Sequence, residues 1–396
     1  MKDSILVINC GSSSLKFAVL ANAGQDSLIE GIADRLGTEE SNITFKFESK
    51  KKTILLEDGS HKNAVAQIKE WLNSHPDIAD SLVGIGHRVV HGGETFSQSV
   101  LINETVLDGI KECTQFAPLH NPAHIKGIEI AFELFPGLPQ VAVFDTAFHQ
   151  TIAPEQYLYP IPMHFYRQHH FRKYGFHGTS YRYISQRLEQ VAKGSDQQGV
   201  LVAHLGNGAS TCAIDKGLSV DTSMGITPLE GLMMGTRSGS IDPSLLSFIS
   251  QAEGISADAA LDILNKKSGL LGVSEISNDC RTLEEAMVSG DQRAKLALDM
   301  FASRTAKHLA SMSTTLESID HLVFTGGIGE NSSYLRQAIC DHLKALNITI
   351  DSTLNETAPR GDTTNISSAS SGTNVWIIPT NEELMIALDT ISLISH

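Results

Sequence analysis

Residues 5–20, ILVINCGSSSLKFAVL, join two apolar runs through a turn of small residues at positions 11–14. In the second run Leu15, Phe17 and Val19 alternate with other residues, which is the period of a strand with one buried face. The pattern predicts a β-hairpin with a polar tip.

The same plan recurs at residues 200–214, VLVAHLGNGASTCAI. Gly206 falls where Gly11 does, and the flanking apolar positions are in register. Strand–glycine–strand units are common, so one match alone would not separate duplication from coincidence. Because both tips are polar and contain glycine, the sequence favours two duplicated domains that face one cleft.

Length and composition agree with a globular protein of this size. The 396 residues are enough for two or three domains, and 41% hydrophobic with 19% charged residues is a balance that supports a sizeable core. A formal net charge of −15 argues against general nucleic-acid binding, which needs a basic surface. Any anionic substrate must therefore be met by locally placed cations.

The first ten residues, MKDSILVINC, lack the basic and apolar regions of a signal peptide, and no run of 18 apolar residues occurs. We therefore expect a cytoplasmic protein without a membrane partner. The cysteines are scattered without a CxxC pair, which favours reduced, mostly buried thiols over disulfides or a zinc site. They are Cys10, Cys113, Cys212, Cys280 and Cys340.

Coarser patterns place further elements along the chain. Helices are expected near residues 123–135, 257–267 and 296–316, and a strand is expected to end at Asp145. The run 352–373 is rich in Ser, Thr, Asn and Gly and is predicted to be an exposed loop or irregular edge rather than a functional element. A last helix is expected to open at residues 380–382 and to pack against the first domain.

Two glycine-bearing turns suggest phosphate chemistry. The turn 9–14 offers backbone N–H groups and three hydroxyls, with Lys16 adding a positive charge. The segment GGIGEN at 326–331 follows an apolar strand and precedes a helical pattern, so its amides can face a nucleotide. Neither signal is specific alone. The P-loop, Rossmann and protein-kinase motifs are absent from the sequence.

Charged residues on short glycine-flanked stretches are the next candidates. Arg88 lies in GHRVVHGG and Arg237 in GTRSG, where the backbone can bring a guanidinium close to a carboxylate or phosphate. A lone arginine is more often a solvated surface charge. Asp145 and Glu382 are hard oxygen groups suited to Mg²⁺, although either could instead be a helix cap.

The histidine-rich stretch 164–181 lacks a recognised zinc spacing, so His169 and His170 indicate a structural or surface role more than a metal site. His177 differs, because its small neighbours in GFHGT let the imidazole point into a cleft as a donor to phosphate oxygen. His120, in PLHNP, is a weaker candidate of the same kind.

Taken together, these motifs resemble the acetate kinase, or acetokinase, family nearly end to end. The matching strings are VINCGSSSLKF, GHRVVHGG, APLHNPAH, VFDTAFHQT, YGFHGTS, AHLGNGAS, DTSMGITPLEGLMMGTRSG, FTGGIGENS and IPTNEELMIA. The resemblance implies an α/β fold of duplicated actin/Hsp70-like (ribonuclease H-like) βββαβαβα domains around a central cleft. We expect an N-terminal domain of residues 1–149 plus 383–396 and a C-terminal, nucleotide-binding domain of residues 150–382.

The resemblance also assigns roles residue by residue. Those implied to be catalytic are Arg88, His120, Asp145, His177 and Arg237. The substrate pocket would be walled by Arg88, Val90, Leu119, Phe176 and Pro228, and Asn9 and Glu382 would contact the metal. Nucleotide-binding positions would be Ser14, Lys16, His204, Leu205, Gly206, Asn207, Gly208, Asp279, Cys280, Arg281, Gly326, Gly327, Ile328, Gly329, Glu330 and Asn331.

The implied reaction is Mg²⁺-dependent, with Mn²⁺ as a substitute, and moves a phosphoryl group directly and reversibly between ATP and acetate to give acetyl phosphate and ADP. A homodimer is implied as well. Ser240 departs from the family, which more often has aspartate there. Val90 favours acetate over propionate, but a propionate kinase stays open, as do an actin- or Hsp70-like ATP switch and a metal-dependent hydrolase.

Overall fold

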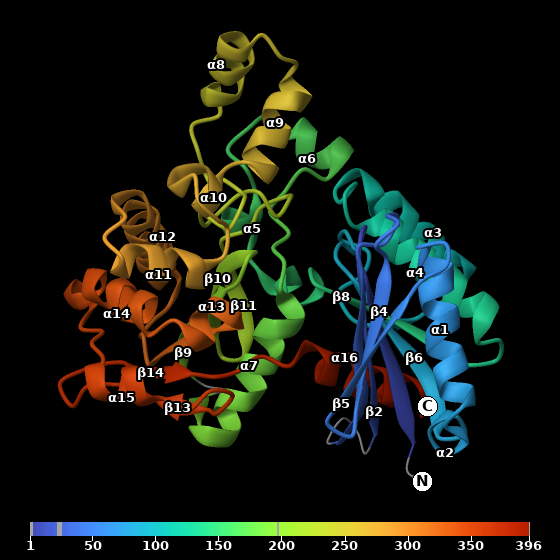
Figure 1. The fold of residues 1–396 in the computed structure, drawn as a ribbon. Coiled ribbons are helices and arrows are strands. Elements are labelled where there is room, and N and C mark those ends of the chain that lie inside the picture. Colours follow the sequence, from blue (N-terminus) through green and yellow to red (C-terminus); the bar gives the residue numbers. More distant parts are fainter. Residues whose placement is uncertain (1–2, 22–25, 196–197, 396) are drawn as a thin grey trace. The chain divides into compact units, whose positions relative to one another are not determined.

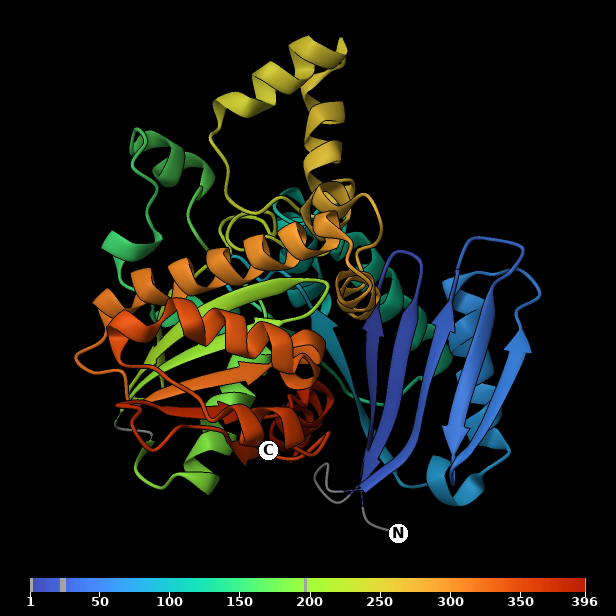
Figure 2. The ribbon, with the colours of Figure 1, turned by 60° about the vertical axis from the view of Figure 1, so that its left-hand side comes forward.

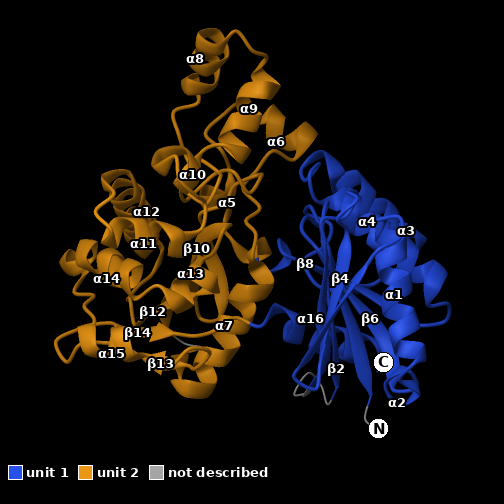
Figure 3. Ribbon diagram, in the orientation of Figure 1, with its two compact units in different colours: residues 1–148, 381–396 blue, residues 149–380 orange. Residues whose placement is uncertain are grey.

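The computed structural model describes residues 3–21, 26–195 and 198–395. Its contacts group the chain into two compact units: unit 1 holds Met1–Phe148 and Asn381–His396, and unit 2 holds His149–Thr380 (Figure 3). Each unit contains one mixed sheet with helices, so the predicted α/β class is confirmed. The predicted domain boundaries remain a prediction, because units defined by contacts need not be domains that fold independently.

Unit 1 is built on a sheet whose order, over the described residues, is β5-β4-β3-β2-β1-β6-β8-β7. The strands are β1 (Ser4–Cys10), β2 (Leu15–Ala21), β3 (Asp26–Asp34), β4 (Asn42–Phe47), β5 (Lys50–Leu55), β6 (Leu82–Val89), β7 (Val100–Leu101) and β8 (Gln140–Phe144). The helices are α1 (His61–Asn73), α2 (Pro76–Ala79), α3 (Glu104–Glu112), α4 (Asn121–Leu134) and α16 (Glu382–Ile394).

Unit 2 is built on a sheet of order β11-β10-β9-β12-β14-β13 in the described part of the chain. Its strands are β9 (Gly199–Leu205), β10 (Ala209–Asp215), β11 (Leu218–Thr222), β12 (His321–Thr325), β13 (Thr364–Asn365) and β14 (Asn374–Ile377). The helices are α5 (Pro154–Tyr157), α6 (His164–His169), α7 (Gly178–Val191), α8 (Ser244–Glu253), α9 (Ala257–Lys266), α10 (Gly269–Ser274), α11 (Cys280–Val288), α12 (Gln292–Met312), α13 (Gly326–Asn331), α14 (Ser333–His342) and α15 (Ser352–Thr357).

The two sheets share one plan. In unit 1, β3, β2 and β1 are antiparallel neighbours, and β6 and β8 continue parallel to β1. In unit 2, β11, β10 and β9 take the antiparallel places, and β12 and β14 the parallel ones. Gly11 and Gly206 each follow directly after the first strand of their unit. The repeated hairpin therefore reflects two units of the same topology.

Helices cover both faces of the sheet in unit 1. On one face α1 and α4 pack over an apolar layer that includes Leu6, Ile8 and Phe45 (Figure 1). On the other, Ile386 of α16 packs with residues of β1, β2 and β8. A β-carbon at Gly86 would lie 2.4 Å from Cγ2 of Ile386, so this position on β6 has no room for a side chain.

In unit 2 the long helix α12 contacts β9 and β10, and Figure 2 shows it running along one face of the sheet. Its apolar residues Leu298, Phe301 and Leu309 are fully buried. The segment 352–373, predicted to be an exposed loop or irregular edge, contains the short edge strand β13 and also the helix α15, which was not predicted. Across the residues that the structure describes, no helix combines the length and apolarity needed to cross a membrane.

The chain passes between the units twice. After β8, the last central strand of unit 1, it enters unit 2, where α7 contacts β9. After β14 it returns to unit 1 as α16, as predicted for the final helix. Asn381 caps α16, since its Oδ1 accepts a 2.9 Å hydrogen bond from the N–H of Leu384. This cap fixes the start of the helix at Glu382.

Candidate active site

Arg88 and Asp145 come together because their strands are parallel neighbours that end at the same edge of the sheet of unit 1. The Arg88 Nε donates to Asp145 Oδ1 at 2.9 Å and its Nη2 donates to Oδ2 at 2.6 Å. Nε also lies 3.8 Å from Glu382 Oε2, at the start of α16. The Asp145 side chain is 1% exposed and that of Arg88 is 21% exposed. Arg88 is therefore a fixed cation between two carboxylates.

The charges of this cluster shift one another's pKa values. Burial alone would lower the pKa of Arg88, but Asp145 and Glu382 outweigh it and raise the pKa, so the guanidinium stays charged. Burial raises the pKa of Glu382 to about 7; Arg88 opposes this shift, and Asp145 and Glu383 add to it. The positive charge near Glu382 therefore does not fully offset the cost of burying its ionised carboxylate.

Four predicted residues line one small hollow of about 20 Å³ in unit 1, which has room for a single water-sized particle. They are Asn9, Lys16, Arg88 and Glu382. In the described residues no three His, Cys, Asp or Glu side chains gather to hold a metal alone. Mg²⁺ commonly takes one or two protein oxygens plus substrate phosphates, so Asn9 and Glu382 fit that cation.

The remaining predicted residues of unit 1 are Ser14, Val90, Leu119 and His120. The Ser14 carbonyl accepts the Gly11 N–H at 2.7 Å and closes the hairpin tip. His120 is the half-buried residue that precedes α4, Val90 is buried and Leu119 is 54% exposed.

His124, one turn into α4, was not predicted. It is 4% exposed, and neither ring nitrogen has a hydrogen-bond partner in the described residues. Its pKa is lowered well below the usual range, first by burial and then by Arg88, His120 and His87. The sequence gives no signal for it beyond its place in the HNPAH string.

In unit 2, His177 is held in a defined orientation directly before α7. Its backbone is left-handed, with φ 57°. Ring atom Nδ1 and the Ser210 Oγ are hydrogen-bonded at 2.8 Å, and the ring stacks on His204 with centroids 4.2 Å apart. The Nδ1 of His204 is hydrogen-bonded in turn to Ser180 Oγ at 2.9 Å. The bond between Nδ1 and Ser210 and the stacking on His204 together fix the orientation of the imidazole ring.

Arg237 lies close to His177. A β-carbon at Gly208, on the tip between β9 and β10, would lie 3.7 Å from the Arg237 Nη1 and 3.7 Å from the His177 Nε2. The Arg237 Nη1 donates to the carbonyl oxygen of Pro228 at 3.3 Å. No carboxylate pairs with Arg237 within residues 3–21, 26–195 and 198–395. Burial lowers its pKa, so this is a half-buried cation without a counter-ion.

The predicted nucleotide segments meet at one pocket of about 520 Å³ in unit 2, a volume typical of small-molecule sites. It is lined by the hairpin tip, the start of α11, and α13 with the residue after it. The lining residues are Gly206, Asn207, Asn278, Asp279, Cys280, Arg281, Glu284, Gly327, Ile328, Asn331, Ser332 and Arg360. Asn278, Glu284, Ser332 and Arg360 were missed, Arg360 because its segment was read as a plain loop.

Backbone geometry brings α13 close to the hairpin tip. Gly326 has φ 77°, and a β-carbon there would lie 2.8 Å from the carbonyl oxygen of Leu205. Oε1 of Glu330 accepts the N–H of Gly326 at 2.9 Å and the N–H of Thr380 at 3.1 Å, so this carboxylate ties the turn together. His204 and Leu205 are buried in β9, which leaves residues 206–208 as the accessible part of the predicted segment 204–208.

The predicted substrate walls are divided between the units. Val90 and Leu119 belong to unit 1, whereas Phe176, which is buried, and Pro228 belong to unit 2. The substrate pocket therefore remains a prediction. Within unit 1 Arg88 contacts Asp145, and within unit 2 Arg237 and His177 both lie near Gly208.

The chain is similar to known proteins over nearly its whole length. A sequence model of the Acetokinase family matches residues 4–388. Acetate kinase of Chromobacterium violaceum is 51% identical over 99% of both chains, and that of Treponema denticola is 50% identical over 98% of this chain and 99% of its own.

Two solved structures are also similar. A propionate kinase from Francisella tularensis has a TM-score of 0.94 at 47% identity and covers 99% of this chain and 100% of its own. Porphyromonas gingivalis acetate kinase has a TM-score of 0.93 at 41% identity over 99% of both chains.

Proposed function

The chain belongs to the acetokinase family, and on that premise we propose that it transfers a phosphoryl group reversibly between ATP and acetate, giving acetyl phosphate and ADP. Its two units of one topology form the duplicated actin- and Hsp70-like fold of acetate kinases. The observation that supports the reaction most is the approach of Arg237 and His177 to Gly208, beside the nucleotide-sized pocket. A cation without a counter-ion at that place suits the terminal phosphate of a nucleotide.

The acetate oxygen is already a nucleophile, so no general base is required. It bonds to the γ-phosphorus as the bond to the bridging oxygen breaks, and ADP leaves with that electron pair. We assign Arg88, Arg237 and His177 to the negative charge that spreads over the equatorial oxygens, and His120 to assist them. Asp145 orients Arg88 through its two hydrogen bonds.

We further assign Asn9 and Glu382 as the protein ligands of Mg²⁺, for which Mn²⁺ can substitute. When bound, the cation neutralises part of the phosphate charge. The Glu382 pKa of about 7 supports this assignment, since a divalent cation would stabilise the ionised carboxylate. Ser14 and Lys16, at the hairpin tip, are assigned to the phosphates.

We also propose that the protein works in the cytoplasm as a homodimer, as the family resemblance implies. All five cysteines are buried and free, which agrees with a reducing compartment. Sedimentation equilibrium of the purified chain tests the dimer.

Hydroxylamine trapping tests the reaction. With ATP, Mg²⁺ and acetate, the protein should form acetyl hydroxamate. ATP hydrolysis that is independent of acetate would instead support an ATP switch, and turnover without nucleotide would support a hydrolase. A propionate kinase is the second candidate, because one similar structure carries that name. A higher kcat/KM for propionate than for acetate would establish it.

A further inference from the structure

The loop of residues 223–240 in unit 2 carries two residues of the proposed site, Pro228 and Arg237. It contains no helix or strand, so its conformation depends on contacts with other segments. The Arg237 Nη1 donates to the Pro228 carbonyl oxygen at 3.3 Å, which couples the two residues. Whatever fixes Pro228 therefore also fixes the guanidinium of Arg237.

Tyr159, in the segment between α5 and α6, bonds to this loop on both sides of Pro228. Its hydroxyl donates to Glu230 Oε2 at 2.5 Å and accepts the N–H of Ile226 at 2.9 Å. One phenol thus spans the five-residue turn 226–230. A β-carbon at Gly225 would lie 1.8 Å from Glu230 Oε2 and 2.2 Å from the Tyr159 hydroxyl, so the carboxylate and the phenol are packed tightly against the loop.

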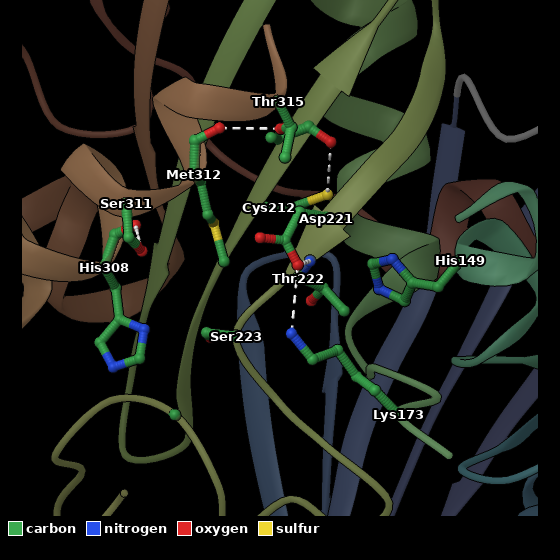
Figure 4. A network of polar contacts seen from close by, with 12 residues as sticks. His149, Lys173, Cys212, Asp221, Thr222, Ser223, His308, Ser311, Met312 and Thr315 are labelled. Atoms are coloured by element: carbon green, nitrogen blue, oxygen red, sulfur yellow. Dashed lines mark hydrogen bonds and ion pairs between the residues drawn. The ribbon is translucent and has the colours of Figure 1, made fainter. Parts of the chain in front are cut away.

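Further bonds from the segment between α6 and α7 hold the first half of the loop. The N–H groups of Tyr174 and Gly175 donate to the Gly225 carbonyl oxygen at 3.1 and 3.3 Å. The Lys173 Nζ lies 3.2 Å from Asp221 Oδ1 at the end of β11, and Figure 4 shows it pointing toward that carboxylate, close to where the loop begins. The second half closes on itself, since Ser240 and Gly231 exchange hydrogen bonds of 2.9 and 3.0 Å.

We propose that Tyr159 and Glu230 are positioning residues, which hold the turn 226–230 so that Pro228 limits substrate size and Arg237 meets the phosphoryl group. The inference rests on the proposed function, because the roles of Pro228 and Arg237 belong to it. A displacement of about 1 Å in such a group can lower turnover by about a hundredfold. The pair therefore controls both rate and substrate preference without touching the substrate.

The test compares Tyr159→Phe, Glu230→Ala and Glu230→Gln with the wild-type chain, using acetate, propionate and ATP as varied substrates. Tyr157→Phe is the matched control, since the Tyr157 hydroxyl lies 3.3 Å from that of Tyr166 and, in the described part of the chain, makes no hydrogen bond to the loop. Tyr159→Phe and Glu230→Ala should each lower kcat/KM for acetate about tenfold or more and raise the propionate-to-acetate ratio. KM for ATP should stay within about twofold.

Glu230→Gln keeps an acceptor oxygen for the phenol and should recover most of the loss. The double variant Tyr159→Phe/Glu230→Ala should be no worse than Tyr159→Phe, because that single change already removes the bonds to Glu230 and Ile226. Equal losses in Tyr159→Phe and Tyr157→Phe, or an unchanged propionate-to-acetate ratio, would overturn the inference. If Tyr159→Phe does not fold, the Glu230→Ala and Glu230→Gln pair decides by the same ratio. Lack of acetyl phosphate formation by the wild-type chain would instead refute the proposed function.

Discussion

The two arginines of the proposed site should differ in what they contribute to stability, although both are expected to serve the reaction. Arg88 makes two hydrogen bonds to Asp145, whose side chain is 1% exposed, and lies 3.8 Å from Glu382. Arg237 has a carbonyl oxygen and a thioether sulfur as its partners. Methionine keeps most of the apolar stem and removes the charge, so Arg88→Met and Arg237→Met are matched changes.

Arg88→Met leaves a buried carboxylate without its cation, and breaking such a pair costs about 3–5 kcal/mol. Arg237→Met loses two weak contacts with neutral acceptors and relieves a desolvated charge, so its cost should stay below about 1 kcal/mol. Both variants should lower kcat by about a hundredfold or more, because each removes a charge that stabilises the transferring group. ATP binding should largely survive in both.

Urea unfolding without ligands measures the free energy of unfolding, and coupled ADP release measures kcat. The double variant Arg88→Met/Asp145→Leu should recover much of the lost stability and none of the activity, since it removes the orphaned carboxylate. Equal destabilisation by Arg88→Met and Arg237→Met would refute the reasoning from counter-ions. Near-normal turnover of both folded variants would refute their role in transfer.

Three further changes test other parts of the proposal. His177→Gln keeps a donor and should retain about tenfold more activity than His177→Ala, whereas stable ³²P label on the wild-type histidine would contradict direct transfer. Val90→Ala should raise the ratio of kcat/KM for propionate to that for acetate, because one methylene group is worth about 1–3 kcal/mol in such a pocket. An unchanged ratio would show that Val90 does not line the substrate pocket. His124→Leu should stabilise the protein by about 1–2 kcal/mol at pH 8, because two orphaned nitrogens are removed.

The gain in the free energy of unfolding expected for His124→Leu should grow as the pH falls from 8 to 5. The pKa of His124 is lowered in the folded state, so its neutral form contributes stability above the unfolded pKa, and that stability is lost as the pH falls below it. His124→Leu has no imidazole at this position, so it does not lose this stability as the pH falls. Urea unfolding at the two pH values measures the difference, and a gain that is the same at both would contradict the lowered pKa.

The hairpins could be predicted from the sequence because each is a local pattern of apolar residues around a glycine. The parallel strands β6, β8, β12 and β14 pair across long insertions, so their order depends on packing that no local pattern contains. At residues 352–373 the small polar composition predicted no regular element, but the segment contains α15 and β13. Asn355 there is buried and accepts from the Arg336 Nε at 2.7 Å, a contact that composition cannot reveal.

The candidate site was predictable where glycine frames a charged residue, as at Arg88 and Arg237. The proposed positioning residues stand in no comparable sequence pattern. Tyr159 and Glu230 are separated by 71 positions and meet only because the segment after α5 folds over the loop. His124 looks like any helical histidine until its burial is known. Long-range packing, not residue type, distinguishes these positions.

The membership of α16 in unit 1 has a consequence for the order of events during protein synthesis. Until residues 382–394 leave the ribosome, the face of the first sheet that includes Ile5, Val7 and Val143 has no helix to cover it. At about 5–20 residues per second, an N-terminal unit that could otherwise fold early must wait many seconds for its last helix. During that interval its uncovered apolar face is the natural target for a chaperone, and the same helix that completes the core delivers Glu382 beside Arg88.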